Sequence, residues 1–292
     1  SGGNDGLNTV VPVRNDIYYR ERRSLGIPGK DTLRLTDAAG LHPELSVFKS
    51  LYDAGDLAVL HNVGYPNPDR SHFRSMDIWH TASPADEYWS TGWLGRYLDA
   101  QCGGSPGESK SNCQSAVLEI DDTLSLALKG ARQKGLALQE PAQLYRTARS
   151  PYFTEYLAAQ NGLQQEESPV GYLYKTMAET LNAADYLFEK SRVRPAAGNY
   201  PNSGLGKHLK TVASLILGGA ETSVYYLSLG SFDTHINQTA QQKRLFKELN
   251  DAFEAFSAEL KAQGRWNDVL VTTFSEFGRR VAQNASGGTD HG

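Results

Sequence analysis

The sequence predicts an α/β protein with a mostly parallel central sheet that helices cover on both faces. Four short runs are continuously apolar or rich in β-branched residues, as strands buried on both faces are: 57–61, 116–120, 223–229 and 268–274. Segments with helical periodicity lie between them. Such strands separated by helices are typical of a parallel sheet within one core.

The expected strands differ in the strength of their signal. Residues 57–61 (Leu-Ala-Val-Leu-His) and 116–120 (Ala-Val-Leu-Glu-Ile) are short apolar runs. Residues 223–229 and 268–274 are stronger candidates, because they are enriched in β-branched and aromatic side chains.

Helices are expected where apolar residues recur at three- and four-residue steps. One spans 43–54, with Pro43 near its first turn. Another spans 239–263, and Gly264 supplies its expected C-cap. Two more are expected over 170–190 and 205–218.

The whole chain, residues 1–292, is expected to form a single domain with a helix-rich insertion over 125–219. The domain is also expected to be truncated at both ends. Asp5 belongs at the carboxyl end of a strand that would lie before Ser1, and His291 is followed by a single residue.

Composition excludes several classes of function. At 292 residues, with 39% hydrophobic and 21% charged residues, the chain is typical of a globular protein with one large core. The net charge of −4 and the lack of a basic run argue against broad nucleic-acid binding. No apolar stretch approaches the roughly 20 residues that a membrane-spanning helix needs. No signal peptide is visible, although a leader removed before Ser1 is compatible with the sequence.

The two cysteines, Cys102 and Cys113, flank small, polar and turn-forming residues that are expected to form an exposed loop. We expect a disulfide between them, which indicates an oxidising compartment. The alternative is two unpaired surface thiols in a cytosolic protein. A metal site is not expected here, because no further ligand lies nearby.

Acidic and histidine residues recur in glycine- or serine-flanked loops at the expected strand ends. In an open parallel sheet, ligands bind at the carboxyl ends of the strands. Carboxylates and imidazoles without thiolates favour zinc, manganese or iron. The alternative is that Asp5 and Asp233 only cap turns and that His235 only begins a helix. The residues expected to hold one or two divalent ions are Asp5, Asp233, His235, Glu276, Asp290 and His291.

A second feature is the segment 67–77, which follows an expected strand and enters a helix. Ser71 would lie at the N-terminus of this helix, where backbone N–H groups favour anions. Arg70, His72 and Arg74 are the candidate substrate-binding residues, and the arginines suit a phosphate or sulfate group. Ser71 next to a metal is a candidate nucleophile; the alternative is that it is only a helix cap.

Five motifs occur in a fixed order along the chain: 2–9, 71–74, 232–238, 275–279 and 288–292. Together they closely resemble the bacterial family called domain of unknown function 1501. That family is similar in turn to the alkaline phosphatase and sulfatase superfamily. The resemblance extends from one end of the chain to the other.

The resemblance implies an alkaline-phosphatase-like three-layer sandwich, export by the twin-arginine route and a metal site at the strand ends. Asp5, Ser71, the Asp233–His235 group and the Asp290–His291 pair match the ligands and nucleophile of the superfamily pattern. Two departures stand out. Asp233 and His235 are closer together than usual, and Glu276 stands where the superfamily places an Asp-His pair, so that Glu276 and Asp290 compete for one role. Thr9 is a second candidate nucleophile.

Two functions follow as expectations. The first is a periplasmic or secreted metal-dependent hydrolase that acts on a small-molecule or polymeric phosphate or sulfate ester, with Ser71 as the attacking group. The second is a non-catalytic exported binding or envelope-associated protein with a degenerate metal site. Fold analogy carries most of this functional expectation.

Overall fold

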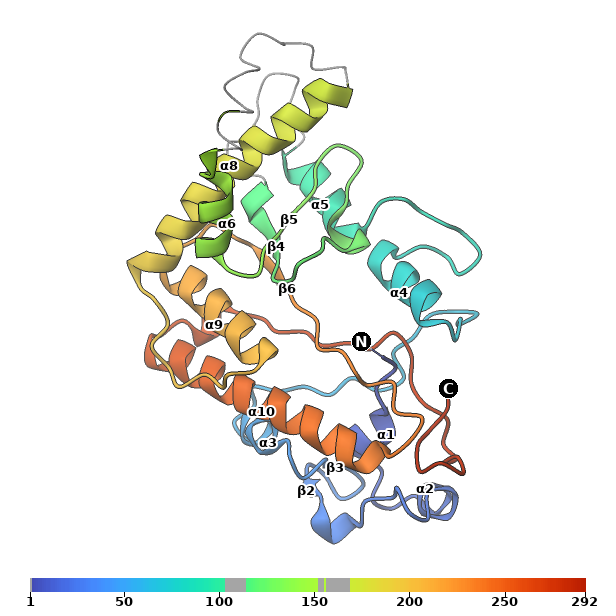
Figure 1. Ribbon diagram of the computed structural model, residues 1–292. Coiled ribbons are helices and arrows are strands. Elements are labelled where there is room, and N and C mark those ends of the chain that lie inside the picture. Colours follow the sequence, from blue (N-terminus) through green and yellow to red (C-terminus); the bar gives the residue numbers. More distant parts are fainter. Residues whose placement is uncertain (1, 103–113, 152–154, 156–168) are drawn as a thin grey trace.

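The computed structural model describes residues 2–102, 114–151, 155 and 169–292, and these form a mixed α/β structure (Figure 1). Small sheets lie among many helices. The α-helices are α1 Gly6–Thr9, α2 Asp16–Glu21, α3 Ser46–Asp53, α4 His72–Thr81, α5 Trp93–Cys102, α6 Pro141–Ala148, α8 Pro169–Val193, α9 Gly204–Leu217 and α10 Gln238–Ala262. Short 3-10 helices are η1 Gly29–Asp31, η2 Gln114–Ala116, η3 Leu126–Leu128 and η4 Trp266–Asp268.

One sheet is parallel, as the sequence predicts, but it is small. Its central strand β4 (Val117–Glu119) pairs in parallel with β5 (Leu136–Ala137) on one side and β6 (Val224–Tyr226) on the other. The second sheet is antiparallel, with β3 (Gly40–Leu41) between β1 (Val10–Val11) and β2 (Leu33–Arg34). Figure 1 shows the parallel sheet between α8 and α6 on one side and α5 on the other.

Successive residues of β4 enter two different cores, because neighbouring side chains of a strand point to opposite faces. Leu118 packs with α9 and α10 in the main hydrophobic core, whereas Val117 packs with α5 and η3 in a smaller one. Both residues are fully buried. The parallel strands are therefore covered on both faces, which explains their continuous apolar sequence.

Two of the expected strands are not formed. Residues 57–61 and 268–274 make no strand in the described structure, and η4 takes the start of the second segment. Some side chains of these two segments pack against the main core, where they are partly buried. The others face solvent, with Leu60 81% and Leu270 89% exposed. An apolar run forms a strand only where a neighbouring strand supplies hydrogen bonds, and neither segment has such a neighbour among the described residues.

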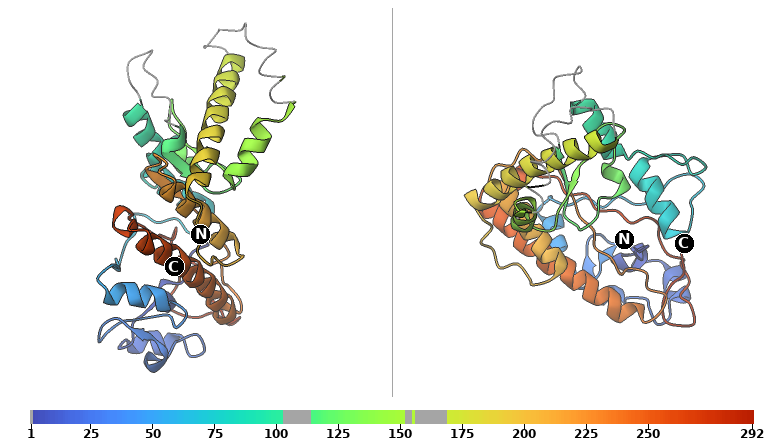
Figure 2. Two further views of the ribbon diagram at one scale, coloured as in Figure 1. Left: turned by 90° about the vertical axis from the view of Figure 1, so that its left-hand side faces the viewer. Right: turned by 45° about the horizontal axis from the view of Figure 1, so that its top comes forward.

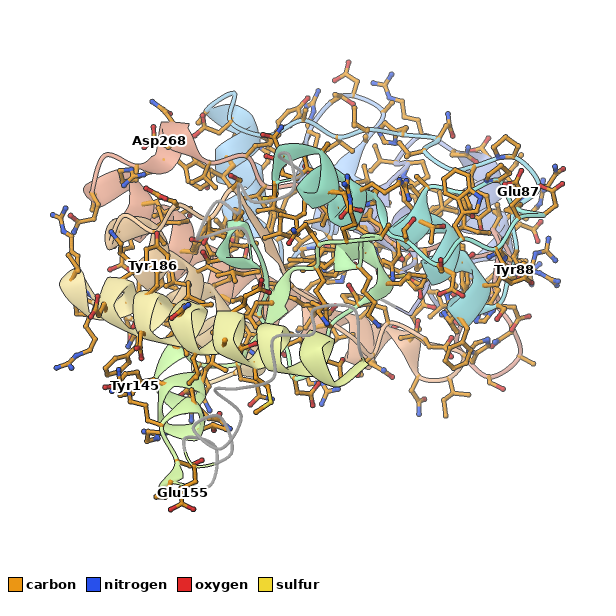
Figure 3. All side chains as sticks on the ribbon, turned by 90° about the horizontal axis from the view of Figure 1, so that it is seen from above. Glu87, Tyr88, Tyr145, Glu155, Tyr186 and Asp268 are labelled. Carbon is orange, nitrogen blue, oxygen red and sulfur yellow. The ribbon has the colours of Figure 1, made fainter. Side chains whose placement is uncertain are left out.

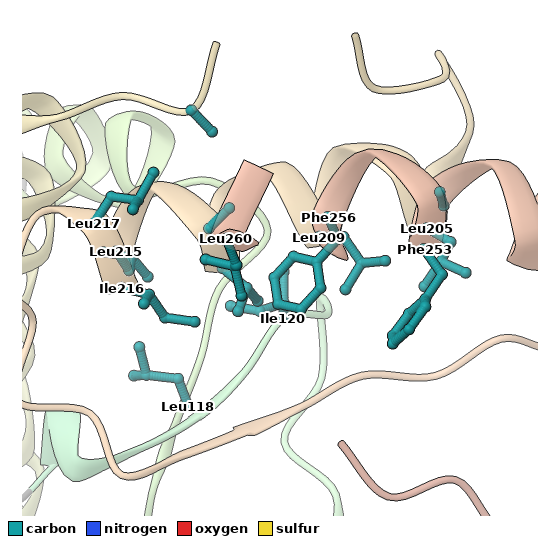
Figure 4. Packing of buried hydrophobic residues seen from close by; sticks show 14 of the residues in the cluster. Leu118, Ile120, Leu205, Leu209, Leu215, Ile216, Leu217, Phe253, Phe256 and Leu260 are labelled. Carbon is teal, nitrogen blue, oxygen red and sulfur yellow. The ribbon is translucent and has the colours of Figure 1, made fainter. Parts of the chain in front are cut away.

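The expected helices are confirmed with small changes in their limits. The apolar steps over 239–263 correspond to α10, which buries Leu245, Phe253, Phe256 and Leu260 along one face. Figure 4 shows Phe256 and Leu260 beside Leu209 of α9. Each fully buried side chain of this size contributes about 1.5–3 kcal/mol by leaving water. This helix pair forms the largest part of the main core.

The helix expected over 43–54 begins later, at Ser46 of α3, and those expected over 170–190 and 205–218 are α8 and α9. None of the described helices combines the length and apolarity needed to cross a membrane. Figure 2 shows that α8 and α5 extend away from the antiparallel sheet, and Figure 3 places Tyr186 of α8 far from Glu87 and Tyr88 in the loop after α4.

Candidate metal centre

Three side chains that are distant in sequence converge at one point: His72, Asp233 and His291. One ligand atom from each lies within 4.8 Å of the other two. His72 is the first residue of α4, Asp233 follows β6, and His291 lies in the last segment of the chain. Such a group of two imidazoles and one carboxylate has the donors that bind divalent transition metals.

Close backbone packing holds the three segments together. His291 forms an isolated antiparallel bridge with Arg279, and the Arg280 N–H donates to the Asp290 carbonyl at 3.0 Å. Gly288 lies so close to His235 that a Cβ atom there would be 2.2 Å from the His235 carbonyl carbon. A glycine is therefore required at this position for the last loop to reach the site.

The hydrogen bonds of two histidines fix which nitrogen faces the centre. His72 Nδ1 lies 2.9 Å from Glu276 Oε1, and His291 Nδ1 lies 2.8 Å from the Arg70 carbonyl oxygen. A carboxylate and a carbonyl only accept hydrogen bonds, so both Nδ1 atoms carry the proton. Each Nε2 atom then presents its lone pair to the centre in the neutral ring.

These Nε2 atoms face a negative oxygen. They lie 3.5 Å (His72) and 3.2 Å (His291) from Asp233 Oδ1. The Nε2 atom of His72 is buried and has no hydrogen-bond partner. Two lone pairs directed at a carboxylate repel it unless a second proton or a cation lies between them. The donor arrangement therefore fits a bound metal ion, with the outer hydrogen bonds orienting the imidazoles as metal sites require.

Asp233 is the anionic member of the group. Burial alone would raise its pKa, but the hydrogen bond from Arg279 and the positive charge nearby lower the pKa to about 2. Arg279 Nη2 lies 2.6 Å and His235 Nδ1 2.9 Å from the same Oδ1 atom. The carboxylate is therefore charged at neutral pH and available as a hard oxygen ligand.

Arg279 organises the centre, although the sequence analysis did not select it as a site residue. Its buried guanidinium donates to the carbonyl oxygens of Gly2 at 2.6 Å, Phe232 at 3.2 Å and Thr289 at 2.8 Å. The only sequence signal was its place at the end of the motif 275–279. A buried cation with so many backbone acceptors ties three distant segments together.

A family model described as "Protein of unknown function (DUF1501)" matches residues 1–292 of this chain. The chain belongs to the DUF1501 family. No curated protein and no solved structure matches it.

In this DUF1501 member, Glu276 does not face the centre as the expected metal ligand. Its Oε1 atom accepts from the Gly2 N–H at 2.6 Å and from His72, and its Oε2 atom from the Ser275 hydroxyl at 3.3 Å. Burial acts to raise its pKa, but hydrogen bonds from its own backbone N–H, from His72 and from the N–H groups of Gly2 and Gly3 keep the pKa below the usual value. The carboxylate instead orients His72, a residue for which the sequence predicts substrate binding.

Two other expected ligands also have different partners. Asp5 is buried in an ion pair with Arg22 and accepts from Gln238, while its other oxygen caps α1 by accepting from the Leu7 N–H at 3.2 Å. Asp290 accepts from Asn284 at 3.2 Å. Neither belongs to the group that the structure brings together.

The expected substrate-binding arginines separate into two kinds. Arg70 is exposed beside the centre, where its carbonyl accepts from His291. Arg74 is buried, and its Nη2 donates to the carbonyls of Ala85 at 2.8 Å and Glu87 at 2.5 Å. Its guanidinium also lies over the Tyr88 ring. Arg74 therefore holds the loop after α4, and its guanidinium has these protein partners where the sequence predicts a bound anion.

The hydroxyl groups of the two candidate nucleophiles, Ser71 and Thr9, differ in their hydrogen bonds. Ser71 is the exposed N-cap of α4, and its hydroxyl makes no capping hydrogen bond, while its N–H donates to Asp69 at 2.6 Å. The Thr9 hydroxyl is committed to the Asp5 carbonyl at 2.8 Å and to Asn4. Of the two, Ser71 has the hydroxyl without a capping hydrogen bond, and it directly precedes His72 of the candidate centre.

The cysteine pairing is tested only in part. Cys102 is the last residue of α5, and no described cysteine is a free thiol. Cys113 lies outside the described residues, so the disulfide between the two stays a prediction.

Proposed function

We propose that this chain is a metal-dependent hydrolase of phosphate or sulfate esters in which His72, Asp233 and His291 hold one divalent ion. The observation that carries the proposal is the pair of imidazole Nε2 atoms 3.5 and 3.2 Å from Asp233 Oδ1, of which that of His72 is buried without a hydrogen-bond partner. The two-histidine, one-carboxylate donor set suits zinc, manganese or iron. A bound ion would supply Lewis acidity to an ester oxygen.

The charges around the centre favour one ion rather than two. Asp233 and Glu276 are negative and Arg279 is positive, so a single divalent ion leaves a small net positive charge that attracts an anionic ester. The Arg279 guanidinium already lies 2.6 Å from Asp233 Oδ1 on the protein side. It takes the place beside this carboxylate that a second cation would need.

The remaining roles belong to residues of the chain itself. Glu276 and the Arg70 carbonyl hold the two imidazoles in the binding orientation. Ser71 is proposed as the attacking group, since its hydroxyl is free and it directly precedes His72. The exposed Arg70 side chain is proposed to hold the anion.

The finer fold and the location are parts of the same proposal. We propose an alkaline-phosphatase-like sandwich with the helix-rich insertion over 125–219. Support comes from the parallel order β5-β4-β6 and from Asp233, which follows the carboxyl end of β6. Twin-arginine export to the periplasm or the exterior is proposed with the Cys102–Cys113 disulfide.

A second candidate is an exported binding protein that takes up a metal without catalysis. It is favoured by the absence of Asp5 and Asp290 from the group of converging ligands, since both were expected to complete a catalytic set. Turnover separates the two functions.

The test combines metal content with turnover. We expect about one zinc, manganese or iron ion per chain by elemental analysis, and metal-dependent hydrolysis of 4-nitrophenyl phosphate or sulfate. His291→Ala should lose both, whereas His61→Ala, at an exposed histidine, should keep both. Metal binding without turnover would support the binding protein, and no metal in wild type would refute both functions.

A further inference from the structure

We infer that the ester accepted by this centre carries a flat apolar group, which stacks on an aromatic platform formed by Trp79 and Phe274. The inference rests on the proposed function and specifies its substrate class. The two rings are stacked, with centroids 5.0 Å apart and an interplanar angle of 30°. Phe274 is 44% exposed, so one aromatic surface of the stack remains open to solvent.

The platform is joined directly to the metal centre. The indole N–H of Trp79 donates to the Glu276 carbonyl at 2.9 Å, and the carboxylate of Glu276 accepts from His72. Phe274 lies two residues before Glu276 in the same segment. A group bound on the platform and an anion at the centre would therefore contact one continuous part of the protein.

The geometry of α4 sets the distance between the aromatic platform and the metal centre. His72 and Trp79 both belong to α4 and are seven residues apart, so they lie on the same face, about 10 Å apart along the axis. At the centre, the ring of Phe277 packs against those of His72 and His291, with centroids 4.8 Å and 4.6 Å away. An ester with one or two fused or linked rings has the length to reach from the centre to the platform.

Two contacts within the protein position the Trp79 ring of the platform. Trp79 is held by its hydrogen bond to Glu276 and by the edge of Tyr65, whose ring centroid is 6.3 Å away. The exposed part of the Phe274 ring would be buried further by a flat ligand that stacks on it. Stacking of this kind contributes about 0.5–1.5 kcal/mol beyond the buried area.

The test compares two non-hydrolysable probes by calorimetry on the zinc-loaded protein: methylphosphonate and 4-biphenylphosphonate. We expect wild type to bind the biphenyl compound about tenfold or more tightly than the methyl compound. Phe274→Ala should reduce this ratio to below about twofold and leave the affinity for methylphosphonate unchanged. Phe274→Leu keeps apolar bulk without a ring and should give an intermediate ratio.

Tyr88→Ala is the matched control, because Tyr88 is a large ring that is 79% exposed in the loop after α4. It should leave the ratio as in wild type. A wild-type ratio near one, a ratio that survives in Phe274→Ala, or self-association through this surface by light scattering would overturn the inference alone. Failure of methylphosphonate to bind zinc-loaded wild type would overturn the proposed function with it.

Discussion

At the scale of single residues, the centre depends on one oxygen atom. Asp233 Oδ1 has nitrogen atoms of His72, His235, His291 and Arg279 around it, at 3.5, 2.9, 3.2 and 2.6 Å. Arg279 is permanently charged, whereas His72 and His291 are oriented by hydrogen bonds at their outer Nδ1 atoms, which leave their Nε2 atoms facing this oxygen. Because each of these residues contacts the same oxygen through its own side chain, substituting them one at a time tests the role of each.

The first prediction concerns the residues behind the ligands. Glu276→Gln should weaken zinc binding about 10–100-fold, because the amide no longer polarises His72 as a carboxylate does. Asp290→Asn should change it less than about twofold, since Asp290 contacts Asn284 rather than the centre. Competition with a chelator measures both. Equal losses in the two variants would make Asp290 a ligand.

The second prediction concerns pH and His42, which is buried and packs against Phe246. Burial lowers its pKa from 6.5 to about 4, opposed by Glu44 and assisted by Lys243. Between these two pKa values, the unfolded chain binds a proton on His42 that the folded chain does not bind. The contribution of His42 to the free energy of unfolding is therefore fully present above pH 6.5 and is lost as the pH drops towards 4. The loss at pH 5 should be about 2 kcal/mol from this residue.

Substitution isolates this contribution. His42 Nδ1 accepts from the Glu44 N–H at 3.2 Å, and His42→Asn retains an acceptor there without the titration. Urea unfolding at pH 7 and pH 5 should show a smaller difference in the variant. An unchanged difference would mean that other groups cause the acid sensitivity.

At the scale of elements, local pattern predicted the helices well and the strands poorly. The apolar steps of α10 and α9 need only their own periodicity and one adjacent core, and both formed. Residues 57–61 and 268–274 have the composition of strands, but a strand also needs a neighbour with free backbone groups. No window of sequence carries that information.

The third prediction concerns the contact between α5 and the segment after η3. A Cβ atom on Gly95 of α5 would lie 2.1 Å from the Lys129 carbonyl carbon, so Gly95→Ala must separate the two elements. We expect a loss of about 1–3 kcal/mol in the free energy of unfolding.

Gly204→Ala is the control for that prediction, because a Cβ at the start of α9 has no neighbour within 4 Å. It should be neutral or stabilise by up to about 1 kcal/mol. Urea denaturation measures both variants. Similar effects of the two substitutions would show that backbone entropy, not the close contact, decides the result.

At the scale of the whole molecule, the centre is assembled from both ends and the middle of the chain. The sequence placed Asp233 and His291 among the ligands, and the structure brings these two together. The sequence alone does not show that Arg22 and Gln238 bind the Asp5 carboxylate. Nor does it show that Glu276 accepts a hydrogen bond from the outer nitrogen of His72. Those outcomes depend on which polar groups fold against each carboxylate, and sequence spacing does not specify them.

The fourth prediction is that zinc stabilises the entire fold, because the ligands are joined only in the native state. At a free zinc concentration of 100 times Kd, the gain in the free energy of unfolding is about 2.7 kcal/mol, which for a chain of this length is a rise in Tm of about 4 °C. His291→Ala should abolish the rise, and His61→Ala should retain it. Differential scanning fluorimetry measures it; the same rise in both variants would place the ion elsewhere.

The hydrogen bond from Gly2 to Glu276 joins residues 274 positions apart. Contacts so remote form late in folding, after the nearby helices have paired, since the entropy of closing the loop must first be overcome. Uptake of a metal ion would therefore mark the completion of folding. A chain with native helix content that fails to bind zinc would be a folding intermediate. Zinc binding would thus report whether the chain has folded completely.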